Sequence, residues 1–178
     1  MKRLSLLLSA FALCFGILAG CTSEKAPETT QPSAGDTTPE TVPAPDVTVY
    51  TAEGQAVKLS DFFGKPVVLN FWASWCGPCK AEMPDFEKVY KELGEEVQFL
   101  LVNLTDGRNE TLETATEFYK NSGYSFPVYY DTSMEAATAY GISSIPTTYF
   151  IDKSGSVITG ANGMLSEDAL RSGIALIR

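Results

Sequence analysis

The sequence has 178 residues, of which 44% are hydrophobic, and it carries 13 basic and 22 acidic side chains but no histidine. A net charge of −9 argues against binding to nucleic acid or to anionic lipid head groups. The lack of histidine excludes His-based metal ligation, Cys–His activation of a nucleophile and a histidine haem ligand, and we expect no cofactor and no metal site.

The first residues have the pattern of a bacterial export signal. Lys2 and Arg3 form a basic start, and the apolar run over residues 4–18 is too short for a comfortable membrane span. Leu18-Ala19-Gly20-Cys21 resembles the lipobox of bacterial lipoproteins, in which the signal is cleaved before a cysteine that carries lipid. We therefore expect residues 1–20 to be a signal peptide and Cys21 to anchor the protein to the cell membrane, outside the cytoplasm. The pattern leaves open an ordinary signal peptide or an uncleaved anchor helix.

The segment after Cys21 is predicted to be a disordered tether. Residues 22–46 contain five of the chain's ten prolines, six threonines and no aromatic residue, so this segment cannot bury enough apolar surface to offset its ordering entropy. We assign residues 21–45 to the lipidated cysteine and its tether. Residues 46–178 are then long enough for one folded domain with a single core.

The first half of this domain begins with short elements and ends in a long helix. In chain order, the pattern predicts a hairpin, a short helical turn, a buried strand and a helix, over residues 47–59, 60–64, 66–72 and 80–93. Pro84 should kink the helix, and Gly94 should end it.

The second half alternates strands with helices. The pattern predicts a strand, a helix, a short strand, a helix, a hairpin and a last helix, over residues 97–102, 111–121, 127–130, 132–140, 147–159 and 167–177. The run at 97–102 is almost wholly apolar, as in a central parallel strand covered on both faces. Thr132 and Glu135 have capping-box spacing at the start of the helix predicted over residues 132–140. The alternation predicts an α/β sandwich of three layers.

The motif Trp75-Cys76-Gly77-Pro78-Cys79-Lys80 lies where the first buried strand passes into a helix. Cys14 would leave with the signal and Cys21 would carry lipid, so this cysteine pair alone remains for redox chemistry. Backbone N–H groups and the helix dipole favour an anionic sulfur there, and a thiolate is the attacking species in disulfide exchange. Two thiolates supply at most half of a tetrahedral zinc site, and Lys80 stands where a c-type haem attachment site needs histidine.

This motif and Gly141-Ile142-Ser143-Ser144-Ile145-Pro146-Thr147, before the last hairpin, resemble the thioredoxin superfamily over about residues 45–178. The resemblance implies a thioredoxin-like fold, in which a central mixed sheet carries helices on both faces and an N-terminal hairpin. An extra helix and strand at about 107–130, together with the anchor segment, resemble the membrane-anchored TlpA/ResA branch. That branch implies a thiol–disulfide oxidoreductase outside the cytoplasm.

The cysteines and one proline take their expected roles from this resemblance and from their positions. Cys76, nearest the free amides of the helix, is expected to attack, and Cys79 to resolve the mixed disulfide. Pro146 matches the cis-proline that faces the cysteines in the superfamily, although the sequence alone allows an ordinary trans proline. We expect substrate to contact the backbone of Ile145 and the exposed part of the motif, formed by Trp75, Gly77 and Pro78.

Asn70 departs from thioredoxin, where a buried aspartate at this strand position helps to move the proton of the second cysteine. ResA-like proteins use a glutamate just after the following strand, and Asp106 stands at that position, so we expect it to accept the proton. The alternative is that Asp106 is an exposed loop residue. Glu82, in the first turns of the helix, is a less favoured candidate for the same role and is expected on a solvated face.

The resemblance also indicates the direction and the partners. Gly77-Pro78 offers no charge or hydrogen-bonding side chain to stabilise a thiolate, which favours a reductant of protein disulfides. The resemblance implies a CcdA- or DsbD-like thiol carrier as electron donor, and work in cytochrome c maturation or in repair of oxidised proteins. We expect a monomer.

Two other functions stay open at this stage. A thiol peroxidase shares the fold, but Ala73-Ser74-Trp75-Cys76 lacks the Thr-x-x-Cys approach that such enzymes usually carry. A copper-binding chaperone could use the two sulfur atoms, but it has no histidine and no nearby methionine pair to assist it.

Overall fold

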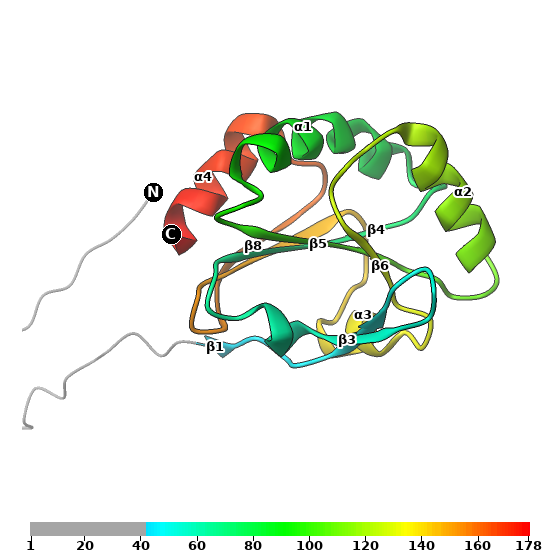
Figure 1. Cartoon of the computed structure of the whole chain (residues 1–178), viewed down its shortest axis with the longest axis horizontal. Helices are drawn as coiled ribbons and strands as arrows, with labels where there is room; N and C mark the ends of the chain where they lie inside the picture. Colours follow the sequence, from blue (N-terminus) through cyan, green and yellow to red (C-terminus); the bar gives the residue numbers. More distant parts are fainter. Residues whose placement is uncertain (1–41) are drawn as a thin grey trace, which may run out of the picture. The chain divides into compact units, whose positions relative to one another are not determined.

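The structure, a computed structural model, describes residues 42–178, and the strands there form one eight-stranded sheet (Figure 1). The strands are β1 (Val42–Pro43), β2 (Thr48–Tyr50), β3 (Ala56–Lys58), β4 (Val67–Trp72), β5 (Gln98–Asn103), β6 (Val128–Tyr130), β7 (Thr147–Ile151) and β8 (Ser156–Asn162). The helices are α1 (Gly77–Leu93), α2 (Leu112–Ser122), α3 (Glu135–Ala139) and α4 (Glu167–Ile177), with a 3₁₀ helix at Leu59–Phe62.

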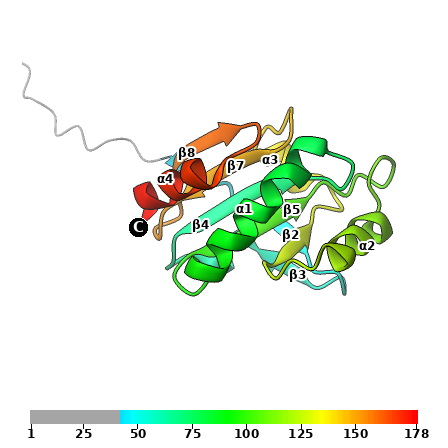
Figure 2. The ribbon, with the colours of Figure 1, turned by 90° about the horizontal axis from the view of Figure 1, so that it is seen from above.

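The sheet is mixed, in the order β1-β8-β7-β4-β5-β6-β2-β3. β4 runs parallel to β5 and antiparallel to β7, and β5 is parallel to β6. Helices α4, α1 and α2 lie over one face, and α3 lies on the other (Figure 1 and Figure 2). Because both faces are covered, β4 is buried along its whole length.

The side chains on the two faces of β4 belong to two separate apolar clusters. Val68 and Trp72 pack among the inward side chains of α1 and α4, whereas Leu69 and Phe71 pack on the opposite side with the α3 region. Successive side chains of a strand alternate between faces, so Asn70 shares the face of Val68 and Trp72. This alternation turns a polar side chain toward the buried side of α1.

The predicted fold class is confirmed. The domain has three layers, a central mixed sheet with helices on both faces, an N-terminal β2–β3 hairpin and an inserted α2–β6 element between β5 and α3. The predicted buried strands at 66–72 and 97–102 are β4 and β5.

Three of the differences from the predicted boundaries have a clear structural reason. The fold begins before residue 46, because β1 pairs with β8 at Val42↔Val157 and Ala44 is buried. Helix α1 starts at Gly77 rather than at Lys80, since Cys76 caps it and a proline in the first turn is compatible with a helix start. Helix α3 starts at Glu135 after a left-handed Met134, so the predicted capping box at 132–135 is not formed.

The predicted signal peptide at 1–20, Cys21 and the tether up to residue 41 lie outside the described residues. Among residues 42–178, no helix has the length and apolar character needed to cross a membrane.

Candidate active site

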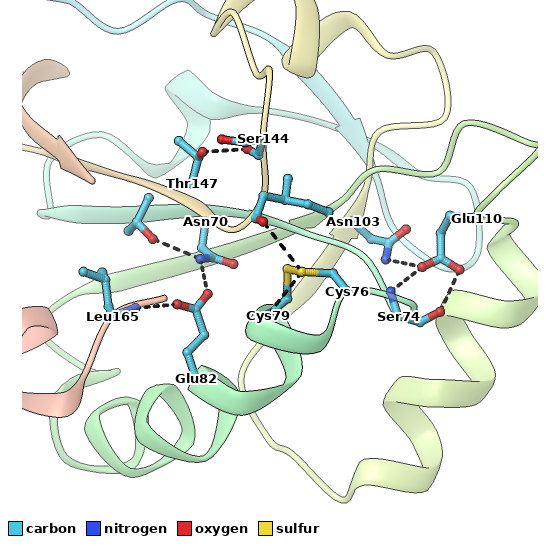
Figure 3. Close-up of a disulfide and its surroundings, with 12 residues drawn as sticks. Asn70, Ser74, Cys76, Cys79, Glu82, Asn103, Glu110, Ser144, Thr147 and Leu165 are labelled. Carbon is cyan, nitrogen blue, oxygen red and sulfur yellow. Dashed lines mark hydrogen bonds between the residues drawn. A yellow bond between two sulfur atoms is a disulfide. The ribbon is translucent and has the colours of Figure 1, made fainter. Parts of the chain in front are cut away.

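Cys76 and Cys79 form a disulfide, with an S–S distance of 2.03 Å, at the junction of β4 and α1 (Figure 3). Cys76 is the N-cap of α1, and its Sγ accepts the backbone N–H of Cys79 at 3.2 Å. Cys76 keeps 4% of its surface exposed and Cys79 keeps none. Cys76 is therefore the less buried of the two cysteines, and its sulfur accepts a helix N–H, a donor that favours a thiolate.

The loop before β7 reaches the disulfide. The Ile145–Pro146 peptide bond is cis, and the carbonyl oxygen of Ile145 lies 3.8 Å from the Sγ of Cys76. The Pro146 carbonyl accepts the N–H of Gly163 at 2.8 Å, and the Thr147 hydroxyl donates to the Ser144 carbonyl at 2.8 Å. Both ends of the loop are thus fixed, and the backbone of Ile145 is held beside the sulfur atoms. Trp75, Gly77 and Pro78 are exposed around them.

Glu82 lies beneath the disulfide on the buried side of α1, so the expectation of a solvated face is wrong. Its side chain is 1% exposed; Oε1 accepts the amide of Asn70 at 2.9 Å, and Oε2 accepts the N–H of Leu165 at 2.9 Å. The same Asn70 amide donates to the Thr148 hydroxyl at 3.0 Å. Burial raises the pKa of Glu82 to about 7, against the lowering effect of the hydrogen bonds from Leu165 and Asn70.

A sequence signal for this burial was present. Cys79, Glu82, Met83 and Phe86 follow i, i+3, i+4, i+7 spacing, which places them on one helical face, and all four are buried. The polar character of Glu82 concealed its place in an otherwise apolar stripe.

A second buried carboxylate, Glu110, holds the segment that leads into Cys76. Its two oxygens accept the backbone N–H and the hydroxyl of Ser74, the latter at 2.9 Å. They also accept the Asn103 amide at 3.4 Å and the Thr114 hydroxyl at 2.5 Å. Glu110 is 1% exposed, and Figure 3 shows it on the Ser74 side of the disulfide, away from Glu82. No local sequence signal identifies Glu110, since nothing marks an acidic residue in a polar loop as buried.

Asp106 organises the loop that carries Glu110. Its Oδ1 accepts the backbone N–H groups of Arg108, Asn109 and Glu110 at 2.8 to 3.0 Å. These hydrogen bonds, above all that from the Glu110 N–H, lower the pKa of Asp106 to about 2. A carboxylate held this way is a poor acceptor for a thiol proton. This argues against the role expected for Asp106 and favours a structural role, in which it stabilises its own loop.

The described residues contain no group of three or more His, Cys, Asp or Glu side chains placed to hold a metal ion. The chemical groups gathered at the disulfide are two sulfur atoms, two buried carboxylates and a backbone carbonyl. Such a set can exchange disulfides and move a proton.

Comparison with known proteins gives the family. The model of the AhpC/TSA family matches residues 41–159. This chain belongs to the AhpC/TSA family. It is 32% identical over 179 residues to the thiol-disulfide oxidoreductase ResA of Geobacillus thermodenitrificans, with 100% of this chain and 95% of the relative covered. The enzyme class predicted from the sequence is therefore confirmed: the chain is a thiol–disulfide oxidoreductase with a thioredoxin-like fold.

Solved structures agree with this assignment. A putative thiol:disulfide interchange protein DsbE from Chlorobium tepidum is 32% identical and has a TM-score of 0.67, with 76% of this chain and 94% of that chain covered. The pneumococcal exposed lipoprotein thioredoxin from Streptococcus pneumoniae is 36% identical and has a TM-score of 0.64, with 74% of this chain and 99% of that chain covered.

Proposed function

We propose that this chain reduces disulfide bonds of client proteins outside the cytoplasm, through the Cys76–Cys79 couple. The observation that carries the proposal is the asymmetry of the pair: Cys76 keeps 4% of its surface exposed, next to the backbone of Ile145, while Cys79 is fully buried. A client sulfur can approach the first cysteine, and the second is protected from outside thiols until a mixed disulfide forms.

The reaction follows from this geometry. The Cys76 thiolate attacks one sulfur of the client disulfide, which forms a mixed disulfide and releases the other client sulfur as a thiolate. Cys79 then loses its proton and attacks the sulfur of Cys76, which releases the second client thiolate and leaves the Cys76–Cys79 disulfide seen in the structure. Two electrons pass from the enzyme to the client.

Glu82 is the proposed acceptor for the proton of Cys79. The two residues are three apart on the inward face of α1, so their side chains are neighbours, and a carboxylate with a pKa of about 7 can take and return a proton near neutral pH. Asn70 suits both states of this carboxylate. Its amide nitrogen donates to the charged form, and its amide oxygen could accept from the protonated form after a rotation of the side chain.

The absence of a charged or hydrogen-bonding side chain at Gly77-Pro78 supports the direction of electron flow. The sulfur of Cys76 accepts the N–H of Cys79, and the dipeptide between the cysteines offers it no side-chain donor. Weak stabilisation of the thiolate keeps a dithiol reducing, whereas strong oxidants owe their potential to a strongly stabilised reduced form.

The lipobox pattern ending at Cys21 supports placement on the outer side of the cell membrane, and one similar structure carries the description of an exposed lipoprotein thioredoxin. A reductant there needs electrons from across the membrane, and a CcdA- or DsbD-like carrier is the proposed donor. Clients would include apocytochromes c or oxidised envelope proteins, and the protein would act as a monomer.

The test is the reduction potential of the couple together with trapping of clients. The full chain, purified in detergent, should equilibrate near thioredoxin, at about −270 mV, and a value close to DsbA, at about −120 mV, would make it an oxidant. Cys79→Ser should accumulate a mixed disulfide with a client peptide that carries one intact disulfide, and Cys76→Ser should form none.

The fold shared with thiol peroxidases leaves peroxide as a second substrate to test. The same preparation should reduce insulin disulfides faster than hydrogen peroxide. Peroxide consumption that depends on Cys76 and exceeds insulin reduction would replace the proposed function by thiol peroxidase activity.

A further inference from the structure

Thr148 is a fully buried residue with a hydroxyl on an otherwise apolar face of the sheet. It lies in β7, and none of its surface is exposed. Since side chains alternate along a strand, Thr148 shares the face of Phe150, which packs in one cluster with Val68 and Trp72. A valine would fill the same space without a polar atom to remove from water. Packing alone therefore does not explain the hydroxyl.

The register of the sheet places Thr148 directly opposite Asn70, which makes the two side chains neighbours on one face. The amide nitrogen of Asn70 donates to the Thr148 hydroxyl at 3.0 Å and to Oε1 of Glu82 at 2.9 Å (Figure 3). This nitrogen carries two hydrogen atoms, so both of its donors are in use. Thr148, Asn70 and Glu82 thus form one buried chain of hydrogen bonds that runs from β7 through β4 to α1.

The bond to Thr148 favours one orientation of the Asn70 amide toward Glu82. An N–H donor stabilises a carboxylate, whereas an amide oxygen would repel it and suits the protonated form. If the hydroxyl is removed while Glu82 is charged, one buried N–H of Asn70 loses its acceptor. In the reverse orientation the amide oxygen keeps its bond from the protonated carboxyl, and a carbonyl with one bond of two costs less than an N–H with none. Loss of the hydroxyl therefore penalises the charged form of Glu82 more than the protonated form.

The other surroundings of Glu82 leave this amide as the adjustable part. Burial raises the pKa of Glu82 most, and the charge of Asp85 on α1 adds to the rise. The groups that contact Glu82 from β4 and from the segment before α4 are an amide and a backbone N–H, both uncharged. At the start of α4, Glu167 is paired with Lys88 at 2.8 Å and with Arg171 at 2.9 Å. The orientation of the amide is the feature that a single hydroxyl controls.

We propose that Thr148 is a positioning residue, which holds the Asn70 amide against Glu82 and thereby favours the charged, proton-accepting form of this carboxylate. Thr148 acts through Asn70 and takes no part in the sulfur chemistry. The proposal rests on the proposed function, in which Glu82 accepts the proton of Cys79, and it adds the residue that prepares the acceptor. A hydroxyl suits this role, because it can accept from one orientation of the amide and donate to the other as Glu82 takes and returns the proton.

The test is an NMR titration of the Glu82 carboxyl in the oxidised full chain, purified in detergent and isotope-labelled at the glutamate carboxyl carbon. The disulfide keeps Cys79 from titrating, and Glu82→Gln identifies the signal by its loss. Thr148→Val should raise the pKa of Glu82 by about 0.5 to 1, which makes the carboxyl a roughly three- to tenfold weaker acid. Thr148→Ser keeps the hydroxyl and should leave this pKa within about 0.2 of the parent value.

Two further variants separate positioning from packing. Thr116→Val removes a hydroxyl that donates to the Leu112 carbonyl within α2, so it is the matched control and should leave the pKa of Glu82 unchanged. Asn70→Leu should raise the pKa of Glu82 by itself. Addition of Thr148→Val to Asn70→Leu should raise it no further, because the two side chains act as one chain of hydrogen bonds.

An unchanged pKa of Glu82 in Thr148→Val overturns the inference, as does an equal rise in Thr148→Ser or an additive rise in the double variant. The pH dependence of insulin reduction is the second readout, and its acid limb should move to higher pH in Thr148→Val by as much as the pKa does. A pKa that moves while the insulin profile stays in place would support the positioning of Asn70 by Thr148 and would instead contradict the proposed function of Glu82.

Discussion

Replacement of Glu82 by glutamine should make the oxidised protein more stable above neutral pH and at the same time slow its chemistry. The pKa of this carboxyl rises from 4.5 to about 7 on folding, chiefly because burial removes it from water. The folded state therefore holds a proton that the unfolded state releases between these two values. Stability contributed by this group is present below about pH 4.5 and is lost as the pH rises through 7.

The size of the effect follows from the shift. Each pKa unit corresponds to about 1.4 kcal/mol, so ionisation of Glu82 lowers the free energy of unfolding by up to about 3 kcal/mol at pH 8. Glutamine has the same shape, can accept the Leu165 N–H, and can donate to Asn70 once that amide rotates. The free energy of unfolding of Glu82→Gln should thus equal that of the parent protein near pH 4.5 and exceed it by about 3 kcal/mol at pH 8.

Urea unfolding of the oxidised protein from pH 4.5 to pH 8 measures the difference, with Glu117→Gln on the exposed face of α2 as the control. Insulin reduction at pH 7 measures the second consequence, a fall of at least about tenfold because Cys79 loses its proton acceptor. A stability difference that is the same at both pH limits would refute the burial argument. Unchanged insulin reduction would refute the assignment of Glu82 as proton acceptor.

Three further substitutions test other parts of the site and the core. Glu110→Ala should cost about 2–4 kcal/mol in urea unfolding because it leaves several buried donors without an acceptor, and Glu110→Gln should cost less than half of that. Asp106→Asn should leave the pH dependence of insulin reduction between pH 5 and pH 9 unchanged, because a carboxyl with a pKa of about 2 does not titrate there; a displaced profile would restore its proposed role. Gly173→Ala should lower the melting temperature, since its new Cβ would lie 2.2 to 2.6 Å from the ring of Phe150, at a cost of about 1–3 kcal/mol. Gly77→Ala, which meets nothing within 4 Å, is the steric control for that measurement.

Local sequence patterns predict most of the fold. The apolar runs became β4 and β5, and the i, i+3, i+4 spacing after the cysteines became α1, because side-chain periodicity reflects backbone geometry within a few residues. Element ends were less accurate. Val42–Pro43 was assigned to the tether, although it pairs as an edge strand, a place where proline is tolerated.

The roles of the carboxylates in the site cannot be predicted from such local patterns. Asp106 was preferred because of its position after β5, yet its own loop binds it with three backbone N–H groups. The sequence favours a solvated face for Glu82, and no local pattern marks Glu110 as part of the site. Their partners come from distant positions: Leu165 is 83 residues from Glu82, and Ser74 is 36 residues from Glu110.

The sequence by itself determined that this chain places two cysteines at the start of a helix in an α/β domain, because a strand, a helix and a Cys-Gly-Pro-Cys motif are local features. Only the tertiary structure decided which acids surround those cysteines. The proton affinity of a carboxylate depends on the water it loses and on the donors it gains, and for Glu82 both come from chain segments that fold over it from β4 and from the loop before α4.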